Sequence, residues 1–126
     1  MSNTKGLQLL SERDRLALAD FIGRLQQNFN HDTIQSVWVF GSKIRGSDDG
    51  ESDIDLLIVV GNYSWQLEKA ITSLAVAVDL VHDVVLSDHV VDSKHFAQML
   101  AQGVPLYRNA IEQGVDLWPM EPQPIT

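Results

Sequence analysis

The spacing of apolar residues in the first part of the chain predicts an amphipathic helix. Ser11-Glu12-Arg13-Asp14 resembles a capping box with Asp in the final place, so we expect the helix to begin there. It should end near Asn28 to His31. Its apolar face is formed by residues that recur at helical spacing: Leu18, Phe21, Ile22, Leu25 and Phe29.

Two short apolar segments follow, and each is typical of a β-strand. Ile34 to Phe40 is rich in Val, Trp and Phe, and it stops at Gly41-Ser42. Residues 43–52 are polar and contain glycine, which indicates a turn with room for one helical turn. Ile54 to Val60 is almost wholly apolar after Asp55, so we expect a second strand that is buried on both faces.

The second half of the chain predicts further helices and strands before an irregular end. Residues 67–74 carry apolar side chains at the spacing of an amphipathic helix, and Val76 to Leu86 is predicted to form a third strand. A short helix is expected next, with an apolar face of Phe96, Met99 and Leu100. Gly103 stands where a C-terminal cap belongs, and Val104 to Tyr107 is expected to be a final short strand.

The length of 126 residues fits one compact domain. We assign residues 1–108 to this domain. Residues 109–126 hold three of the four prolines and show no clear periodicity, so we expect an irregular tail. The tail could contact a partner, or it could cover the domain's own core.

Composition excludes several classes of protein. No apolar run approaches the ~20 residues that span a bilayer, and the first residues lack the features of a signal peptide, so we expect no membrane contact and a cytoplasmic location. The chain has no cysteine, which excludes disulfides and thiolate metal sites. The four histidines show no helix-spaced ligand pair and are expected not to bind metal: His31, His82, His89 and His95.

Negative charge is concentrated in the middle of the chain. The net charge is −8, and residues 47–92 hold ten acidic residues and a single basic one, Lys69. Such a segment repels a nucleic-acid backbone, so broad binding to DNA or RNA is not expected. The same segment would attract cations, although most of these carboxylates could simply keep the surface soluble.

Asp53 and Asp55 are the strongest candidates for chemistry. Alternate residues of a strand point to the same face, so the two side chains would lie together, with Cα atoms about 6.5–7 Å apart. Without a cation, their mutual repulsion would destabilise the strand. Mg²⁺ favours such oxygen ligands and usually completes its coordination with water and phosphate oxygens.

Gly41-Ser42 comes directly after an apolar strand and could receive a phosphate. Glycine lets a phosphate approach the backbone closely, and the following N–H groups and the Ser42 hydroxyl can donate to it. Lys43 and Arg45 could meet phosphate charge or pair with acids. For Arg45, the dense acidic run beside it favours an ion pair.

Other enzymes that use an Asp-x-Asp pair fit less well. Phosphatases of the haloacid-dehalogenase type place the pair after an apolar strand, whereas here the apolar run 56–60 follows the pair. Nucleotide-sugar glycosyltransferases need a much longer chain.

The combination of Gly-Ser-x-x-Arg-Gly, a five-residue gap and Ser-Asp-Ile-Asp-Leu resembles the polymerase-β-like nucleotidyltransferase superfamily, in particular its minimal nucleotidyltransferase branch. The resemblance covers about residues 11–108. It implies an α/β (α+β) fold with a small mixed sheet flanked by helices. It also implies that two Mg²⁺ ions and ATP bind, with nucleotide contacts at Gly41, Ser42, Lys43, Arg45 and Ser52.

In that family a third carboxylate on a later strand completes the metal site, and AMP or another nucleoside monophosphate moves to an acceptor hydroxyl as pyrophosphate leaves. The matching segment here is Val78-Asp79-Leu80-Val81. Asp79 is the expected third metal ligand, because an acid among apolar residues would be costly without a role. Asp83 competes, since it would lie on the same face of the strand but nearer to solvent. One ion would then be held by all three aspartates, and the other by Asp53 and Asp55.

The resemblance also implies a partner. Members of the minimal branch act as antitoxins that adenylylate a tyrosine of a small helical HEPN-type toxin, often a ribonuclease, and we expect the same role and a hetero-oligomer here. One alternative is a non-catalytic antitoxin that neutralises its partner by binding alone. Another is an enzyme that modifies a small molecule such as an aminoglycoside.

Overall fold

The structure is a computed structural model, and it describes residues 4–30, 32–46 and 53–118. The helices are α1 (Thr4–Leu7), α2 (Glu12–Asn28), α3 (Ser42–Arg45), α4 (Trp65–His82), α5 (Ser93–Ala101) and α6 (Pro105–Gln113). The strands are β1 (Ile34–Phe40), β2 (Ile54–Val60), β3 (Leu86–Asp92) and β4 (Val115–Asp116).

The four strands form one mixed sheet in the order β3-β2-β1-β4. β1 runs antiparallel to β2 and to β4, whereas β2 and β3 are parallel. Helix α4 supplies the crossover that a parallel pair requires. The expected fold class, a small mixed sheet flanked by helices, is confirmed.

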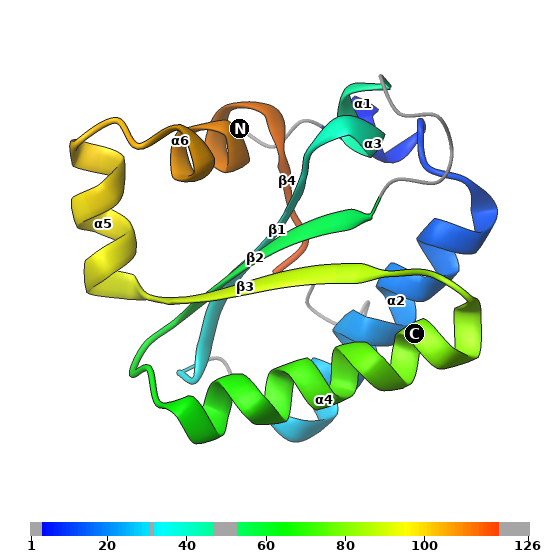
Figure 1. The fold of residues 1–126 in the computed structure, drawn as a ribbon, viewed down its shortest axis with the longest axis horizontal. Helices are drawn as coiled ribbons and strands as arrows, with labels where there is room; N and C mark the ends of the chain where they lie inside the picture. Colours follow the sequence, from blue (N-terminus) through cyan, green and yellow to red (C-terminus); the bar gives the residue numbers. More distant parts are fainter. Residues whose placement is uncertain (1–3, 31, 47–52, 119–126) are drawn as a thin grey trace, which may run out of the picture.

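Helices cover both faces of the sheet. Figure 1 shows α2 and α4 together beneath it, with α5 and α6 on the other side. The larger core cluster joins α2 and α4 to one face of β2 through Leu56, Ile58 and Val60. A smaller cluster on the opposite face contains Leu57 and Val59. Both faces of β2 are therefore buried, as its apolar sequence predicts.

The first helix and the β1–β2 pair agree with the sequence. Helix α2 ends at Asn28, and Ser11 caps its start by accepting a hydrogen bond from Asp14 N at 3.1 Å. Gly103 adopts a φ of 72° beyond α5, as a C-terminal cap requires. The single turn of α3 is the helical turn for which residues 43–52 leave room.

Two predictions for the second half of the chain are wrong. Residues 76–82 continue helix α4, and the third strand begins only at Leu86. The buried residues Ile71, Ala75 and Val78 keep the helical period through this region, so burial of one face favours the helix. The expected strand from Val104 instead becomes helix α6, which begins with Pro105 in its first turn.

The chain is also ordered beyond Arg108. Residues 109–118 complete α6 and form β4, so the expectation of an irregular tail from residue 109 is wrong for them. Leu117 and Trp118 are buried in the larger core cluster. They therefore cover the domain's own core, whereas residues 119–126 lie outside the described part. No helix within the described residues is long and apolar enough to cross a membrane.

Asp116 gives this C-terminal strand a pH-dependent stability. Its Oδ1 accepts hydrogen bonds from Trp118 N at 2.9 Å and from Val37 N at 3.3 Å. Burial raises the pKa of the Asp116 carboxyl above its usual 3.8, and the two hydrogen bonds offset only part of that rise. The folded state thus holds the proton more tightly than the unfolded chain. The stability that the protonated Asp116 carboxyl contributes to the fold is therefore fully present below pH 3.8. It is lost as the pH rises through the raised pKa of the folded state.

We expect Asp116→Asn to raise the free energy of unfolding at pH 7, because the amide oxygen can still accept both hydrogen bonds and no charge is buried. The difference from the unmodified protein should shrink as the pH falls toward 4. Urea denaturation at both pH values measures it, with the exposed Asp32→Asn as the control. A gain of the same size at both pH values would contradict the electrostatic cause.

Candidate functional site

The predicted Gly-Ser turn lies directly against the second aspartate. A Cβ added to Gly41 would lie 2.2 Å from Asp55 Oδ2 and 3.1 Å from Asp55 Cγ. The strand register explains this approach, since Phe40, the last residue of β1, pairs with Asp55. Gly41 also has a φ of 95°, a conformation that L side chains rarely adopt. Both observations require glycine at this position.

The turn leads at once into α3. Ser42 is the first residue of that helix, and Ile44 N donates to Gly41 O at 3.2 Å to close the turn. Gly46 ends α3 in the left-handed conformation, with a φ of 76°. The N–H and hydroxyl groups of Ser42 thus belong to the same short turn as the glycine that the Asp55 carboxylate contacts.

Asp53 is exposed just ahead of β2, and its neighbour Ile54 donates its N–H to Val85 O at 2.9 Å. This hydrogen bond joins the start of β2 to the connection between α4 and β3. Figure 1 shows α3, the start of β2 and the C-terminal end of α4 on the same side of the molecule.

Asp79 reaches this region from a helix. The prediction that it lies on a strand is wrong, because α4 extends to His82. Its Oδ1 accepts a hydrogen bond from Leu86 N at 2.9 Å, which holds the carboxylate beside the first residue of β3. Burial raises the pKa of the Asp79 carboxyl above 3.8; the Leu86 hydrogen bond opposes this, and the charges of Asp88 and Asp53 raise it further. Asp53 and Asp79 are therefore near enough to interact electrostatically.

The competing Asp83 lies in a different environment. It follows α4 as its C-cap, with a φ of 56°, and its side chain is fully exposed. It lies at ion-pair distance from Arg13, with an Nη1–Oδ2 distance of 3.9 Å. The side chain of Asp79, by contrast, is held at the start of β3 by its hydrogen bond from Leu86 N.

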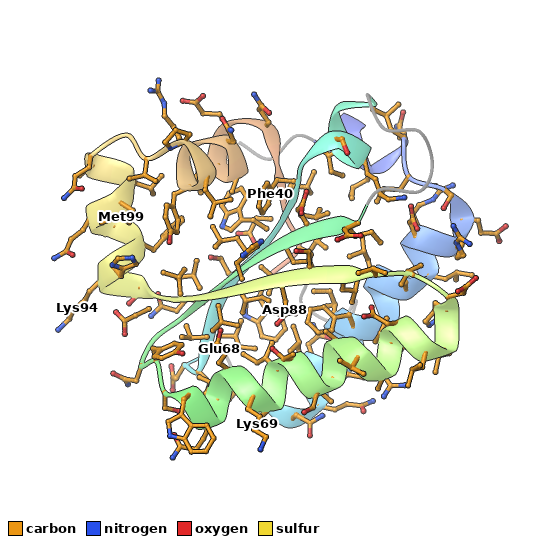
Figure 2. All side chains as sticks on the ribbon, in the orientation of Figure 1. Phe40, Glu68, Lys69, Asp88, Lys94 and Met99 are labelled. Atoms are coloured by element: carbon orange, nitrogen blue, oxygen red, sulfur yellow. The ribbon has the colours of Figure 1, made fainter. Side chains whose placement is uncertain are left out.

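Strand β3 places no carboxylate beside Asp55. The parallel register pairs Asp55 with Ser87 and Leu56 with Asp88. Asp88 faces α4, where its Oδ2 accepts a hydrogen bond from Thr72 Oγ1 at 2.7 Å (Figure 2). Among the described residues, β3 therefore supplies no acid at the position paired with Asp55.

The described residues fit Mg²⁺ as a pair of carboxylate ligands. Asp53 and Asp55 are hard oxygen donors, and the Asp55 carboxylate packs against Gly41 in the space that a Cβ at position 41 would take. Within the described ranges, no three Asp, Glu or His side chains are already gathered closely enough to hold a metal. Water and phosphate oxygens would have to supply the remaining ligands, as they usually do for Mg²⁺.

Lys43 is buried and lies in an ion pair. Its Nζ is 2.9 Å from Asp14 Oδ2, and the two side chains are 6% and 5% exposed. Of its two expected roles, phosphate contact or pairing with an acid, this contact corresponds to the second. The side chain of Arg45 and the whole of Ser52 lie outside the described part.

Sequence reasoning missed Asp14 as part of this region. It is read from the sequence only as the last position of a capping box. Yet Asp14 precedes Ala17, Leu18 and Phe21 at helical spacing, so it stands on the apolar face of α2. An acid on a buried face needs a charged partner, and that signal could have identified it.

Comparison with protein families identifies the family of this chain. The family model described as polymerase beta, nucleotidyltransferase matches residues 24–112, well over half of the chain. The match begins within α2 and ends within α6, so it includes the Gly41 turn, Asp53, Asp55 and Asp79. No curated protein sequence matches the chain at a significant level.

Proposed function

Because the chain belongs to the polymerase beta nucleotidyltransferase family, we propose that it is a Mg²⁺-dependent enzyme that transfers AMP from ATP to a hydroxyl acceptor. The observation that carries this proposal is the approach of Asp55 to Gly41, where a Cβ would lie 2.2 Å from Oδ2. This approach supports the proposal because the carboxylate proposed to bind metal lies next to a turn whose backbone could bind phosphate.

Each residue of the proposed site has its own role in the reaction. Gly41 and Ser42 would bind phosphate oxygens, while Asp53, Asp55 and Asp79 would hold the metal. When bound, Mg²⁺ would neutralise the triphosphate and lower the pKa of the acceptor hydroxyl. The acceptor oxygen forms a bond to the α-phosphorus, the bond to the β-phosphate oxygen breaks, and pyrophosphate leaves. Asp79 is the proposed acceptor of the hydroxyl proton.

The other predicted nucleotide contacts are Lys43, Arg45 and Ser52, and we propose different roles for them. Arg45 and Ser52 stay predicted phosphate contacts. Lys43 would act through its ion pair with Asp14, because its ammonium group is buried with that carboxylate.

We propose a protein as the acceptor, namely a tyrosine of a HEPN-type toxin that this chain would neutralise in the cytoplasm. Exposed apolar side chains near Asp79 in the chain support a protein partner: Leu80, Val81 and Val85 are 81%, 66% and 55% exposed. Residues 47–92 hold ten acids and one base, which favours a partner with a basic surface.

The proposal is tested by incubating the chain with Mg²⁺, the helical protein encoded beside it and ATP labelled at the α-phosphorus. We expect label on a tyrosine of the partner, and none with ATP labelled at the γ-phosphorus, because pyrophosphate is released. Replacing the labelled tyrosine by Phe should abolish labelling.

Other outcomes separate the alternatives. A stable complex with no label under any nucleoside triphosphate would support a non-catalytic antitoxin. Label on an aminoglycoside in place of the protein would support a small-molecule enzyme. For the third carboxylate, we expect Asp79→Asn to abolish labelling and Asp83→Asn to retain it; the reverse result would assign that role to Asp83.

A further inference from the structure

We propose that Asp14 is a positioning residue for the Gly41-Ser42 turn, acting through Lys43. This inference rests on the proposed function, since it concerns how the same phosphate-binding turn is held. It arises from the fact that Asp14 and Lys43 are the only two polar or charged side chains that are buried in the described part of the chain. Their Nζ–Oδ2 distance is 2.9 Å.

The turn needs support from outside itself. Helix α3 spans only Ser42–Arg45, and its flanking residues Gly41 and Gly46 both have positive φ. A helix of one turn is not stable alone, because its nucleation fixes several residues for a single hydrogen bond. Ile44, which is 1% exposed, packs into the larger core, and Lys43 reaches α2. These two contacts fix α3 from adjacent residues.

Asp14 is itself held rigidly. It lies in the first turn of α2, where its N–H donates to the capping Ser11 Oγ at 3.1 Å. A carboxylate near a helix N-terminus is favoured by the helix dipole. Asp14 therefore offers Lys43 a fixed acceptor, and Lys43 directly follows Ser42 in the chain.

Stability alone does not account for such a pair. Removing two charges from water costs about as much as their attraction returns, so an apolar pair of similar volume is often equally stable or more so. Pairing with the Asp14 carboxylate restricts where the buried Lys43 ammonium group can lie, and this restrains the Lys43 backbone and the adjoining Ser42. Apolar side chains would pack equally well at this site. A role in positioning the turn explains why the two residues are charged instead.

The test is the double variant Asp14→Leu/Lys43→Met, which removes both charges of this pair and is expected to fold. We expect its KM for MgATP to rise at least tenfold with a smaller change in kcat, while its urea midpoint stays at or above that of the unmodified protein. The matched control is Arg108→Met/Glu112→Leu, which removes an exposed ion pair of α6, and its KM should be unchanged.

Single variants distinguish positioning from direct contact. If Lys43 positions the turn, Asp14→Asn and Lys43→Met each raise KM, and the double variant is no worse than either. Lys43→Arg should restore most of the affinity. A KM for MgATP that is unchanged or lower in Asp14→Asn but raised in Lys43→Met would overturn the inference, because Lys43 would then act on phosphate directly. A normal KM in the double variant would also overturn it.

Affinity for MgATP, measured by calorimetry, separates this inference from the proposed function. If the unmodified chain binds MgATP but transfers nothing, the transfer reaction fails, and the variants still decide the role of Asp14 by affinity. If transfer occurs and all variants bind MgATP equally, the inference alone fails.

Discussion

Asp55→Asn is expected to lower the rate of AMP transfer at least about 10³-fold, equivalent to roughly 4 kcal/mol of transition-state stabilisation. The substitution keeps the size of the side chain, so the contact with Gly41 is preserved while the charge of the proposed metal ligand is lost. The variant should be as stable as the unmodified protein, because Asp55 lies at the start of β2 and the apolar residues after it form the core.

The measurement is kcat/KM for transfer with Mg²⁺ varied, beside a urea denaturation curve. Asp83→Asn is the matched control, since that carboxylate is fully exposed and Asn tolerates its left-handed backbone conformation. It should retain activity. Transfer within tenfold of normal in Asp55→Asn would remove Asp55 from the metal site.

Gly41→Ala is expected to lower transfer at least about 10²-fold and to destabilise the fold by about 1–3 kcal/mol. Two costs add at this position. The φ of 95° is strained for alanine, and its Cβ would lie 2.2 Å from Asp55 Oδ2, so the turn or the carboxylate must move. A shift of either separates the phosphate-binding backbone from the carboxylate that would hold the metal.

Two other glycines separate these costs. Gly103 has a φ of 72°, but a Cβ added there would meet no atom within 4 Å, so Gly103→Ala should be destabilised by strain alone and keep its activity. Gly23 lies within α2 with an ordinary φ, and a Cβ added there would meet no atom within 4 Å. Gly23→Ala should therefore raise the free energy of unfolding by about 0.5–1 kcal/mol. If Gly103→Ala lost as much activity as Gly41→Ala, the contact with Asp55 would not be the cause.

The parts of the fold that could be predicted are those fixed by near neighbours in the sequence. Helix α2 has a cap and a regular apolar face, and β1 and β2 form an antiparallel pair whose register brings Phe40 to Asp55. The Gly-Ser turn and the Asp-x-Asp pair lie at the ends of these elements. Their meeting therefore follows from local structure together with the family resemblance.

The third strand could not be placed because exposed and buried apolar residues look alike in a sequence. Val76, Leu80 and Val81 are 49%, 81% and 66% exposed on α4, yet together with Val78 they read as a buried strand. The true strand β3 is at the edge of the sheet and carries polar residues such as Asp88 and His89. Edge strands commonly carry charge, and this weakens their apolar signal.

The Asp14–Lys43 ion pair and strand β4 were not predicted because both depend on contacts between residues far apart in the sequence. Asp14 and Lys43 come from different elements, and no short-range pattern joins them. Likewise, the two residues of β4 show no periodicity of their own. Pairing of Val39 with Val115 makes them a strand, and this pairing carries Leu117 and Trp118 into the core.

The position of β4 has a consequence for synthesis of the protein. β1 is paired on one side with β2, which follows it closely, and on the other with β4, which is made last of the strands in the described residues. A growing chain can thus assemble the turn, Asp53 and Asp55 while the Trp38–Val39 edge of β1 still lacks its partner. During that interval the open backbone edge is a template for pairing with another nascent chain. Released chains truncated after Gly114 should therefore associate with one another more readily than chains that end at Trp118.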